Sequence, residues 1–369
     1  CEQHPGVEVR FEIMTTEQMD DALENGTNVD VFLTASNFTN LDRLVHRGLI
    51  APLASETLLA NMAKMYAPFR DYVTYQQQVY AYPREVLANT RTVNTELLRM
   101  YGSFLGEVPT TMSEYIEQMR KWYDTSITVG SDSSFTEQNM PETLLEYTLD
   151  ELVIAYLCEY YQTDDTRGTY RDFSTSDFAN MLDSLDFLRV AAFQMTEAEE
   201  KPWNAAAWGE KSGSLYTKVG FTPVVIGFEE NEQYILPPAF DAEDEQCIIT
   251  YLQLLVIRAD SEKQAMANAF IEAVAESDIG EKSNFELFED TDGLVNPGVT
   301  EEELQAYREM LPHFDLHTGA IISGMFWGEE SATDVLMAYF HQDLTKEEAL
   351  SKLDAMQSQW IQQQPMGVH

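Results

Sequence analysis

The 369-residue chain has few cysteines and few basic side chains. Only three cysteines occur, Cys1, Cys158 and Cys247, and no two of them form a C-x-x-C pair. A disulfide framework and a thiolate zinc site are therefore not indicated. Only 22 Lys and Arg stand against 63 Asp and Glu, which gives a formal net charge of −41. A chain this acidic has no basic face for nucleic acid or an anionic membrane surface, so we expect neither partner.

The sequence also lacks a long hydrophobic run and the common phosphate and nucleophile motifs. The longest mostly apolar run, 247–257, contains Thr250 and Gln253 and is too short to cross a membrane. No P-loop, G-x-G-x-x-G, G-x-S-x-G or S-x-x-K pattern is present, which weakens an enzymatic interpretation. His313 and His317 lack the acidic partner of a zinc-protease motif and are expected to be a surface pair. We therefore expect no metal, no cofactor and no catalytic residue.

The length and the distribution of charge favour a large, acid-coated protein. At 369 residues the chain exceeds one typical core and suits two lobes. The acidic residues are dispersed, which favours a solvated surface coat over a cation site. A salt-adapted source is an alternative that this charge leaves open.

Local patterns predict alternating strands and helices. Alternation of apolar and polar residues over 7–13 predicts a strand, and Thr15 with Gln18 forms a capping box that predicts a short helix. Residues 28–35 have the composition of a buried strand. Two further strands are predicted at 126–130 and 248–257.

The segment 79–94 predicts a crossing between two packed bodies. It mixes apolar and polar residues on both sides of the Tyr82-Pro83 step, as an extended segment does when it leaves one body and enters another. Helix patterns precede it, and a new α/β region begins after it, at 94–98 and 109–114.

The order of these signals resembles that of the extracellular solute-binding proteins of ABC importers, family 1, which are maltose-binding-protein-like. The segments that carry the resemblance are 26–32, 47–53, the crossing with Asn94, 109–111 and 235–238. Nearly the whole chain is covered. The resemblance implies an α/β, two-lobed, periplasmic-binding-protein type II-like fold, with discontinuous lobes joined by hinge crossovers.

The resemblance also implies where the lobes lie. Lobe 1 is expected at 1–86 and 243–298, and lobe 2 at 87–242 and 299–369. The family's usual first strand and most of its first helix are expected to be missing. Cys1 is then either a truncation point or an acylated lipoprotein cysteine.

The function implied is that of a receptor. It binds an oligosaccharide or sugar-like solute in the cleft between the lobes, as a monomer, and delivers it to ABC permease subunits. Its location is extracellular, anchored to the membrane as a lipoprotein, or periplasmic. Two alternatives stay open, an extracellular glycan-active enzyme and a truncated, non-transporting relative.

A sugar offers hydroxyl groups, which suit Asp, Asn, Glu and Arg, and apolar faces, which suit flat aromatic rings. The resemblance implies that Trp327 matches an aromatic stacking position and that Phe221 falls close to a second. Thr34 and Leu87 depart from the maltose-binding pattern, so maltodextrin specificity is not expected. The predicted ligand-binding residues are Asn37, Phe38, Arg84, Glu85, Asn89, Asp132, Phe221, Phe326 and Trp327.

Overall fold

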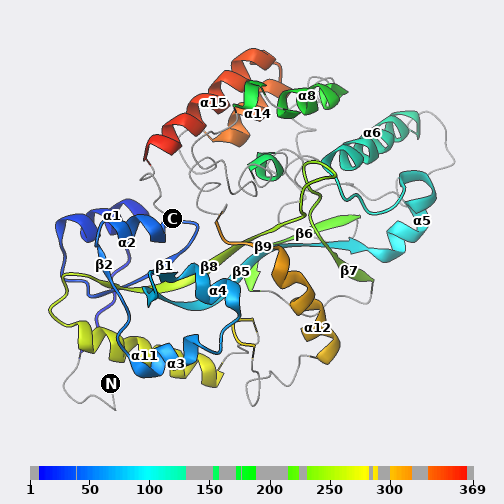
Figure 1. Cartoon of the computed structure of the whole chain (residues 1–369). Coiled ribbons are helices and arrows are strands. Elements are labelled where there is room, and N and C mark those ends of the chain that lie inside the picture. Colours follow the sequence, from blue (N-terminus) through cyan, green and yellow to red (C-terminus); the bar gives the residue numbers. More distant parts are fainter. Residues whose placement is uncertain are drawn as a thin grey trace.

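The computed structural model describes residues 8–38, 40–129, 153–157, 172–175, 177–187, 215–223, 231–281, 286–289, 300–317 and 331–363, in which strands and helices alternate (Figure 1). The strands are β1 (Val31–Ala35), β2 (Ile50–Ala51), β3 (Thr74–Tyr75), β4 (Gln78–Val79), β5 (Ala81–Asn94), β6 (Tyr216–Pro223), β7 (Glu232–Ile235), β8 (Ile248–Arg258) and β9 (Phe314–Asp315). The α-helices are α1 (Thr16–Asn25), α2 (Leu41–His46), α3 (Glu56–Met62), α4 (Ala67–Tyr72), α5 (Thr95–Leu105), α6 (Met112–Val129), α8 (Asp177–Ser184), α11 (Gln264–Glu281), α12 (Glu301–Met310), α14 (Ala332–Phe340) and α15 (Lys346–Gln363). Two 3₁₀ turns, η2 (Phe173–Thr175) and η4 (Leu311–His313), and a short helical stretch at 153–157 also belong to the described chain.

One long strand, β5, organises the main sheet. The sheet has the strand order β1-β8-β5-β6, with β2 and β9 paired to β8 and β7 paired to β5. All of these pairs are antiparallel except β8 with β9. The first half of β5 pairs with β8, and its second half pairs with β6 and β7. Residues 81–94 of the predicted crossing at 79–94 therefore form a single strand that runs through the sheet.

Buried side chains form two clusters, one at each half of β5. The first cluster includes side chains from α1 to α4, the first half of β5, β8, α11 and α12. The second includes side chains from α5, α6, α8, β6, α14 and α15. Figure 1 shows α1 to α4 and α11 around one end of the sheet and α5 and α6 at the other, with α8, α14 and α15 on its upper side. Each cluster draws on segments that are far apart in the sequence.

Neighbouring side chains of β8 belong to different clusters. Ile248 and Leu252 pack in the first cluster, whereas Ile249 and Tyr251 pack in the second. Successive side chains of a strand point to opposite faces, so one strand serves both clusters here. The predicted strand over 248–257 is confirmed by β8, which ends at Arg258.

The first helix forms for the reasons that its sequence predicts. The backbone N–H of Thr15 donates to Gln18 Oε1 at 2.9 Å, and the N–H of Gln18 donates to Thr15 Oγ1 at 3.2 Å. Its buried residues, Met19, Ala22 and Leu23, recur at helical spacing and enter the first cluster. The predicted capping box is confirmed.

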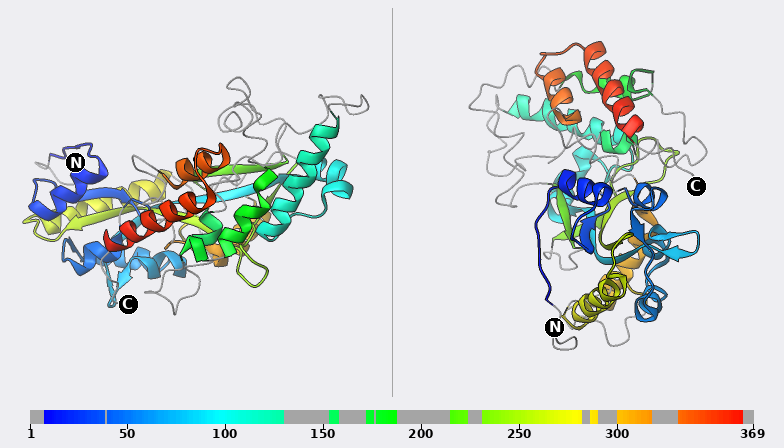
Figure 2. Two further views of the ribbon diagram at one scale, coloured as in Figure 1. Left: turned by 90° about the horizontal axis from the view of Figure 1, so that it is seen from above. Right: turned by 90° about the vertical axis from the view of Figure 1, so that its left-hand side faces the viewer.

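The prediction of a strand over 7–13 is wrong for the described part of that segment. Residues 8–13 form no strand, and the side chains of Phe11 and Ile13 are 86% and 99% exposed. Within the described chain, β1 at the edge of the sheet pairs with β8 alone. An alternating pattern needs a neighbouring strand before it can form a ladder, and none lies beside this segment in the described residues. The right-hand view of Figure 2 shows the segment running from α1 along the outside of the molecule.

The predicted strand over 126–130 is also wrong for its described residues, 126–129, because α6 continues through Val129. The buried residues Met112, Tyr115, Ile116 and Met119 recur at helical spacing and fix the start of the helix in the second cluster. Once a helix has begun, each further residue adds a hydrogen bond, and β-branched residues weaken this by only a few tenths of a kcal/mol.

The segment with α12, η4 and β9 packs in the first cluster. Leu304, Tyr307 and Leu311 are among its buried members. Nδ1 of His313 lies 2.8 Å from the carbonyl oxygen of Gln246, just before β8. No helix in the described ranges is long and apolar enough to span a membrane.

Candidate functional site

The two clusters meet where β5 passes from one to the other. At this level lie 85–89 of β5, 249–253 of β8, 220–223 of β6, and 35–38 at the end of β1. We call these four segments the crossover band. Neighbouring strands lie about 4.8 Å apart, so side chains on one face of the band are within reach of a single small ligand.

A row of half-buried side chains crosses three strands of the band. Ala35 pairs with Gln253, and Gln253 pairs with Glu85 on its other side. Directly paired residues share a face of the sheet, and Leu33 and Leu87 flank the row on that face. Leu33 is exposed and the other four are half-buried. This face therefore offers a carboxylate, an amide and apolar surface to a ligand.

Asn89 supplies a buried acceptor at the far side of the band. It is 5% exposed, and its Oδ1 has no hydrogen-bond partner within the described chain. The register of β5 with β6 shifts between Ala88 and Thr90. The bulge lies on β6 and places Gly220 and Phe221 opposite Asn89. Buried polar atoms without a partner are rare, so this oxygen is a candidate acceptor for a ligand hydroxyl.

The loop after β1 is fixed at its first residue. Ser36 is buried, its backbone N–H donates to the carbonyl of Leu252, and the N–H of Leu252 donates to Ser36 Oγ, both at 2.9 Å. The next residue, Asn37, has a buried Oδ1 with no partner among the residues that the structure describes. Phe38 is 51% exposed. The sheet thus holds the amide of Asn37 and the exposed aromatic ring of Phe38 at the edge of the band.

A tyrosine supports this loop from α4. Tyr72 shares a side-chain hydrogen bond with Ser36, and its ring centroid lies 5.5 Å from that of His317. Burial raises the pKa of Tyr72, and the carboxylates of Asp42 and Asp315 raise it further. The raised pKa keeps Tyr72 a neutral phenol at neutral pH, so its hydrogen bond with Ser36 is retained there.

The structure places most of the predicted ligand residues in or beside the band. Arg84 lies on β5 where its register with β8 shifts, directly before Glu85. Asp132, Phe326 and Trp327 lie outside the described residues, as does the side chain of Phe221. Their ligand roles, and those of the others, stay predictions. The residues in or beside the band are Asn37, Phe38, Arg84, Glu85, Asn89 and Phe221.

Sequence reasoning missed Gln253 and Tyr72. Gln253 interrupts an apolar run, and a polar residue in the middle of a central strand is a usable signal. Tyr72 gave no such signal, because it lies distant in sequence from Ser36 and only the fold joins them.

Each of the two histidines predicted to form a surface pair contacts another part of the fold. Nδ1 of His313 contacts the carbonyl of Gln246 at 2.8 Å, and the ring of His317 packs on Tyr72. Across the described ranges, no group of three or more His, Cys, Asp and Glu side chains could hold a metal ion.

Comparison with solved structures gives two similar chains over almost the full length. One is the GacH receptor of Streptomyces glaucescens, solved without ligand and in complex with acarbose; it is 16% identical, covers 99% of this chain and 93% of its own, and has a TM-score of 0.60. The other was solved in a study of xylan utilization by the thermophilic bacterium Caldanaerobius polysaccharolyticus; it is 16% identical, covers 97% and 93%, and has a TM-score of 0.60. No protein-family model and no curated protein matches the sequence.

At this level of identity the likeness establishes the fold. The two discontinuous clusters joined through β5 and β8 fit a two-lobed α/β fold. The predicted fold class is confirmed, and the chain has the same fold as the maltose-binding-protein-like sugar receptors.

Proposed function

We propose that the chain is the substrate-binding component of an ABC importer, which captures an oligosaccharide or sugar-like solute between its lobes and delivers it to permease subunits. The observation that supports this most is the crossover band. It gathers predicted ligand residues from β1, β5 and β6 at the junction of two cores, on the fold of a receptor that was solved with acarbose.

The chemistry of the band suits a neutral polyhydroxylated ligand. Glu85, Gln253 and the amides of Asn37 and Asn89 accept or donate hydrogen bonds to hydroxyl groups. Phe38 and Leu33 offer exposed apolar surface to the C–H faces of a sugar ring. The band has few cationic side chains, so it offers little to an anionic solute.

The mechanism follows from having one lobe on each side of the band. A ligand that contacts both lobes favours the closed arrangement, and one that contacts a single lobe does not. We propose lobes at 1–86 with 243–298 and at 87–242 with 299–369. Buried residues between Leu304 and Leu316 pack in the first cluster. This packing favours a lobe 1 that continues past residue 298 and ends beyond residue 317.

The test is a binding screen against neutral oligosaccharides by thermal shift, followed by calorimetry on each ligand found. A ligand at about 100 times its Kd stabilises by about 2.7 kcal/mol, which a thermal shift detects. The recovered sugar is then analysed for product. An unchanged sugar supports a receptor, a cleaved sugar supports the alternative of a glycan-active enzyme, and no binding to any glycan overturns the proposal.

The proposal includes a site of action outside the cytoplasmic membrane and contact with permease subunits. It is supported by the fold alone. Stimulation of permease ATPase activity by the loaded but not the empty protein is the expected result in a reconstituted system.

A further inference from the structure

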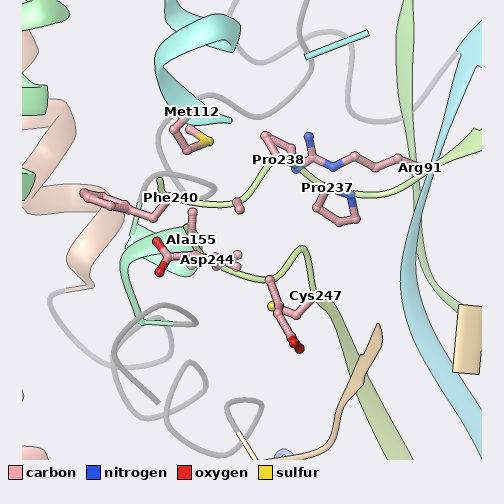
Figure 3. Close-up of a pocket in the computed structure, with 11 residues that line it drawn as sticks. Arg91, Met112, Ala155, Pro237, Pro238, Phe240, Asp244 and Cys247 are labelled. Atoms are coloured by element: carbon pink, nitrogen blue, oxygen red, sulfur yellow. The ribbon is translucent and has the colours of Figure 1, made fainter. Parts of the chain in front are cut away.

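The pocket between β5, α6 and the β7–β8 loop is too small for a second ligand. Arg91, Met112 and Phe240 are among the side chains that line it (Figure 3). Its interior has a volume of about 20 Å³, which is room for about one water molecule. Backbone groups that are open to a partner lie elsewhere, on the outer edge of the main sheet.

The edge strand β1 turns every second residue away from its neighbour β8. The carbonyl of Asp30, just before β1, accepts the N–H of Arg258 at 3.1 Å. The N–H of Ser36, just after β1, donates to the carbonyl of Leu252 at 2.9 Å. In an antiparallel pair, alternate residues exchange hydrogen bonds with the partner strand. The even-numbered residues of β1 therefore bond to β8, and the backbone groups of the odd-numbered residues point to the outer side.

The outer side of β1 is open to another strand. The carbonyl of Ala35 accepts the N–H of Phe38 at 3.0 Å. The carbonyls of Val31 and Leu33, and the N–H groups of all three odd-numbered residues, have no backbone partner in the described chain. Native edge strands are usually protected by Lys, Pro or a bulge, and β1 has none of these. The side chain of Leu33 is 53% exposed as well.

The segment 8–13 has the sequence of a strand and no sheet around it. Apolar residues at 9, 11 and 13 alternate with charged residues at 8, 10 and 12. All six are exposed, with Phe11 at 86% and Ile13 at 99%. The segment runs from α1 along the outside of the molecule (Figure 2, right). A strand of this pattern buries its apolar face only when a sheet receives it.

We propose that residues 8–13 of a second copy of this chain add to the outer side of β1, and that two copies exchange these segments in a two-fold dimer. A foreign strand on β1 would leave 8–13 exposed, whereas exchange between two copies pairs both features at once, as a self-complementary contact requires. The dimer departs from the monomer that the resemblance implies. It does not depend on the proposed sugar-binding function.

The pleat decides which side chains meet in the added strand. Val9, Phe11 and Ile13 share one face of the segment, because successive side chains of a strand point to opposite faces. On the face of β1 that carries the exposed Leu33, these three side chains gain an apolar neighbour. Leu33 flanks the row of the crossover band, so the segment of the partner copy lies beside the proposed ligand site.

Sedimentation velocity from micromolar to millimolar concentration measures the oligomeric state. The fraction of dimer is expected to rise with concentration. The ionic strength is kept moderate and fixed, because two copies that each carry a formal charge of −41 repel one another when salt does not screen them.

A photo-reactive side chain identifies the contact. Isotope-labelled protein with p-benzoylphenylalanine in place of Phe11 is equilibrated with an equal amount of unlabelled parent protein and illuminated. Mass spectrometry is expected to find the labelled segment joined to unlabelled peptides that contain 31–35. Such mixed pairs arise only between two copies.

Variants at the two halves of the contact test the pairing. Val31→Pro removes an N–H that points to the outer side and leaves the hydrogen bonds to β8 in place. It is expected to weaken the dimer about tenfold or more, because each dimer loses this donor twice. Val31→Ala loses the same side chain but keeps the N–H, so it is the matched control and is expected to dimerise nearly as the parent does.

The second pair of variants lies in the segment, which packs on nothing in the described chain, so it tests the proposal even if Val31→Pro fails to fold. Ile13→Ser is expected to weaken the dimer, and Glu12→Gln, on the opposite face, is expected to leave it unchanged. A protein that stays monomeric at every concentration overturns the proposal. So do cross-links that never join the two isotopes, which mean docking on the chain's own β1, and a dimer that Val31→Pro and Ile13→Ser leave intact. A failure to bind any sugar leaves these measurements unaffected.

Discussion

The carboxylate of Glu114 completes the start of α6. Its Oε2 accepts the backbone N–H of Thr110 at 2.8 Å, the hydroxyl of Thr110 at 3.0 Å and the N–H of Thr111 at 3.2 Å. The backbone hydrogen bond from Thr110 is the main cause that lowers the pKa of Glu114. We expect Glu114→Ala to lower the free energy of unfolding by about 0.5 to 1 kcal/mol at neutral pH, the lower half of the range for caps because the side chain is exposed.

The effect has a defined pH dependence. A carboxyl group with a lowered folded pKa stabilises the protein above its unfolded pKa, near 4.3, and loses this contribution as the pH falls through its folded value. Urea unfolding of both proteins at neutral and acidic pH is the measurement. Glu117→Ala, on the exposed side of the same helix, should cost less, and a difference between Glu114→Ala and the parent that persists at acidic pH contradicts this role.

Trp327 carries the sharpest ligand prediction, although it lies outside the described residues. If its ring stacks on a sugar face, Trp327→Ala weakens binding by roughly 2 kcal/mol or more, with a smaller effect on folding. Trp360 is the matched control, since it is buried in the second cluster. Trp360→Ala is expected to cost about 3 to 5 kcal/mol of stability. Calorimetry and denaturant melts of both variants decide: unchanged affinity of Trp327→Ala together with a large loss of stability would mean that the ring packs in the core and that the ligand assignment is wrong.

At the residue scale, the sequence predicted side-chain chemistry better than side-chain neighbours. Polar side chains at crossings and loop starts suit a ligand, which predicts Asn37, Glu85 and Asn89 as ligand residues. The registers of β1, β5 and β8 bring these three residues to one level of the sheet. Tyr72 was not predictable, because its contact with Ser36 exists only once α4 has packed beside β1.

At the scale of the element, the end of β1 depends on one serine. Ser36 is buried and exchanges two hydrogen bonds with Leu252 of β8. Ser36→Ala leaves the N–H of Leu252 without its partner in a buried position, which is expected to cost about 1 to 3 kcal/mol. The loop that carries Asn37 and Phe38 then loses an anchor, so affinity for a verified sugar should fall as well.

Urea melts and calorimetry of Ser36→Ala measure both effects. Ser103→Ala, at an exposed position of α5, is the matched control and should change neither quantity. A Ser36→Ala variant as stable as the parent would show that the hydrogen bonds to Leu252 contribute little.

Element boundaries were predictable where local signals and packing agree, and not elsewhere. The α1 capping box and its buried stripe point to the same helix, which forms. The alternation over 7–13 has no strand beside it in the described chain, so the exposed Phe11 and Ile13 form no ladder. Of the segment 126–130, which was predicted to be a strand, residues 126–129 continue the helix that begins at Met112. A strand is a property of two segments, and one segment alone does not determine it.

At the scale of the whole molecule, the net charge of −41 makes folding sensitive to salt. Repulsion among like charges opposes the compact state, and salt screens it over a distance of ~10 Å at 0.1 M. This charge acts on both lobes alike, so closure and ligand titrations are comparable only at one fixed ionic strength.

The two-cluster architecture predicts that the lobes close around a ligand. In the described chain, β5 and the β7–β8 loop join the two clusters, so a change in the angle between lobes must bend these segments. To move the open and closed forms from 1:99 to 99:1, a ligand must favour the closed form by about 5.5 kcal/mol, which requires contacts on both lobes. Small-angle scattering with a saturating, calorimetrically verified sugar should therefore show a smaller radius of gyration.

The variant Trp327→Ala supplies the control for this measurement. At a sugar concentration that saturates the parent but not the variant, only the parent should become more compact. If the variant is brought to full occupancy at higher concentration and compacts equally, Trp327 contributes affinity but is not needed for closure. A parent protein that binds sugar fully with no change in radius of gyration contradicts lobe movement, because a ligand in the crossover band would then be held by a single fixed arrangement of the two clusters.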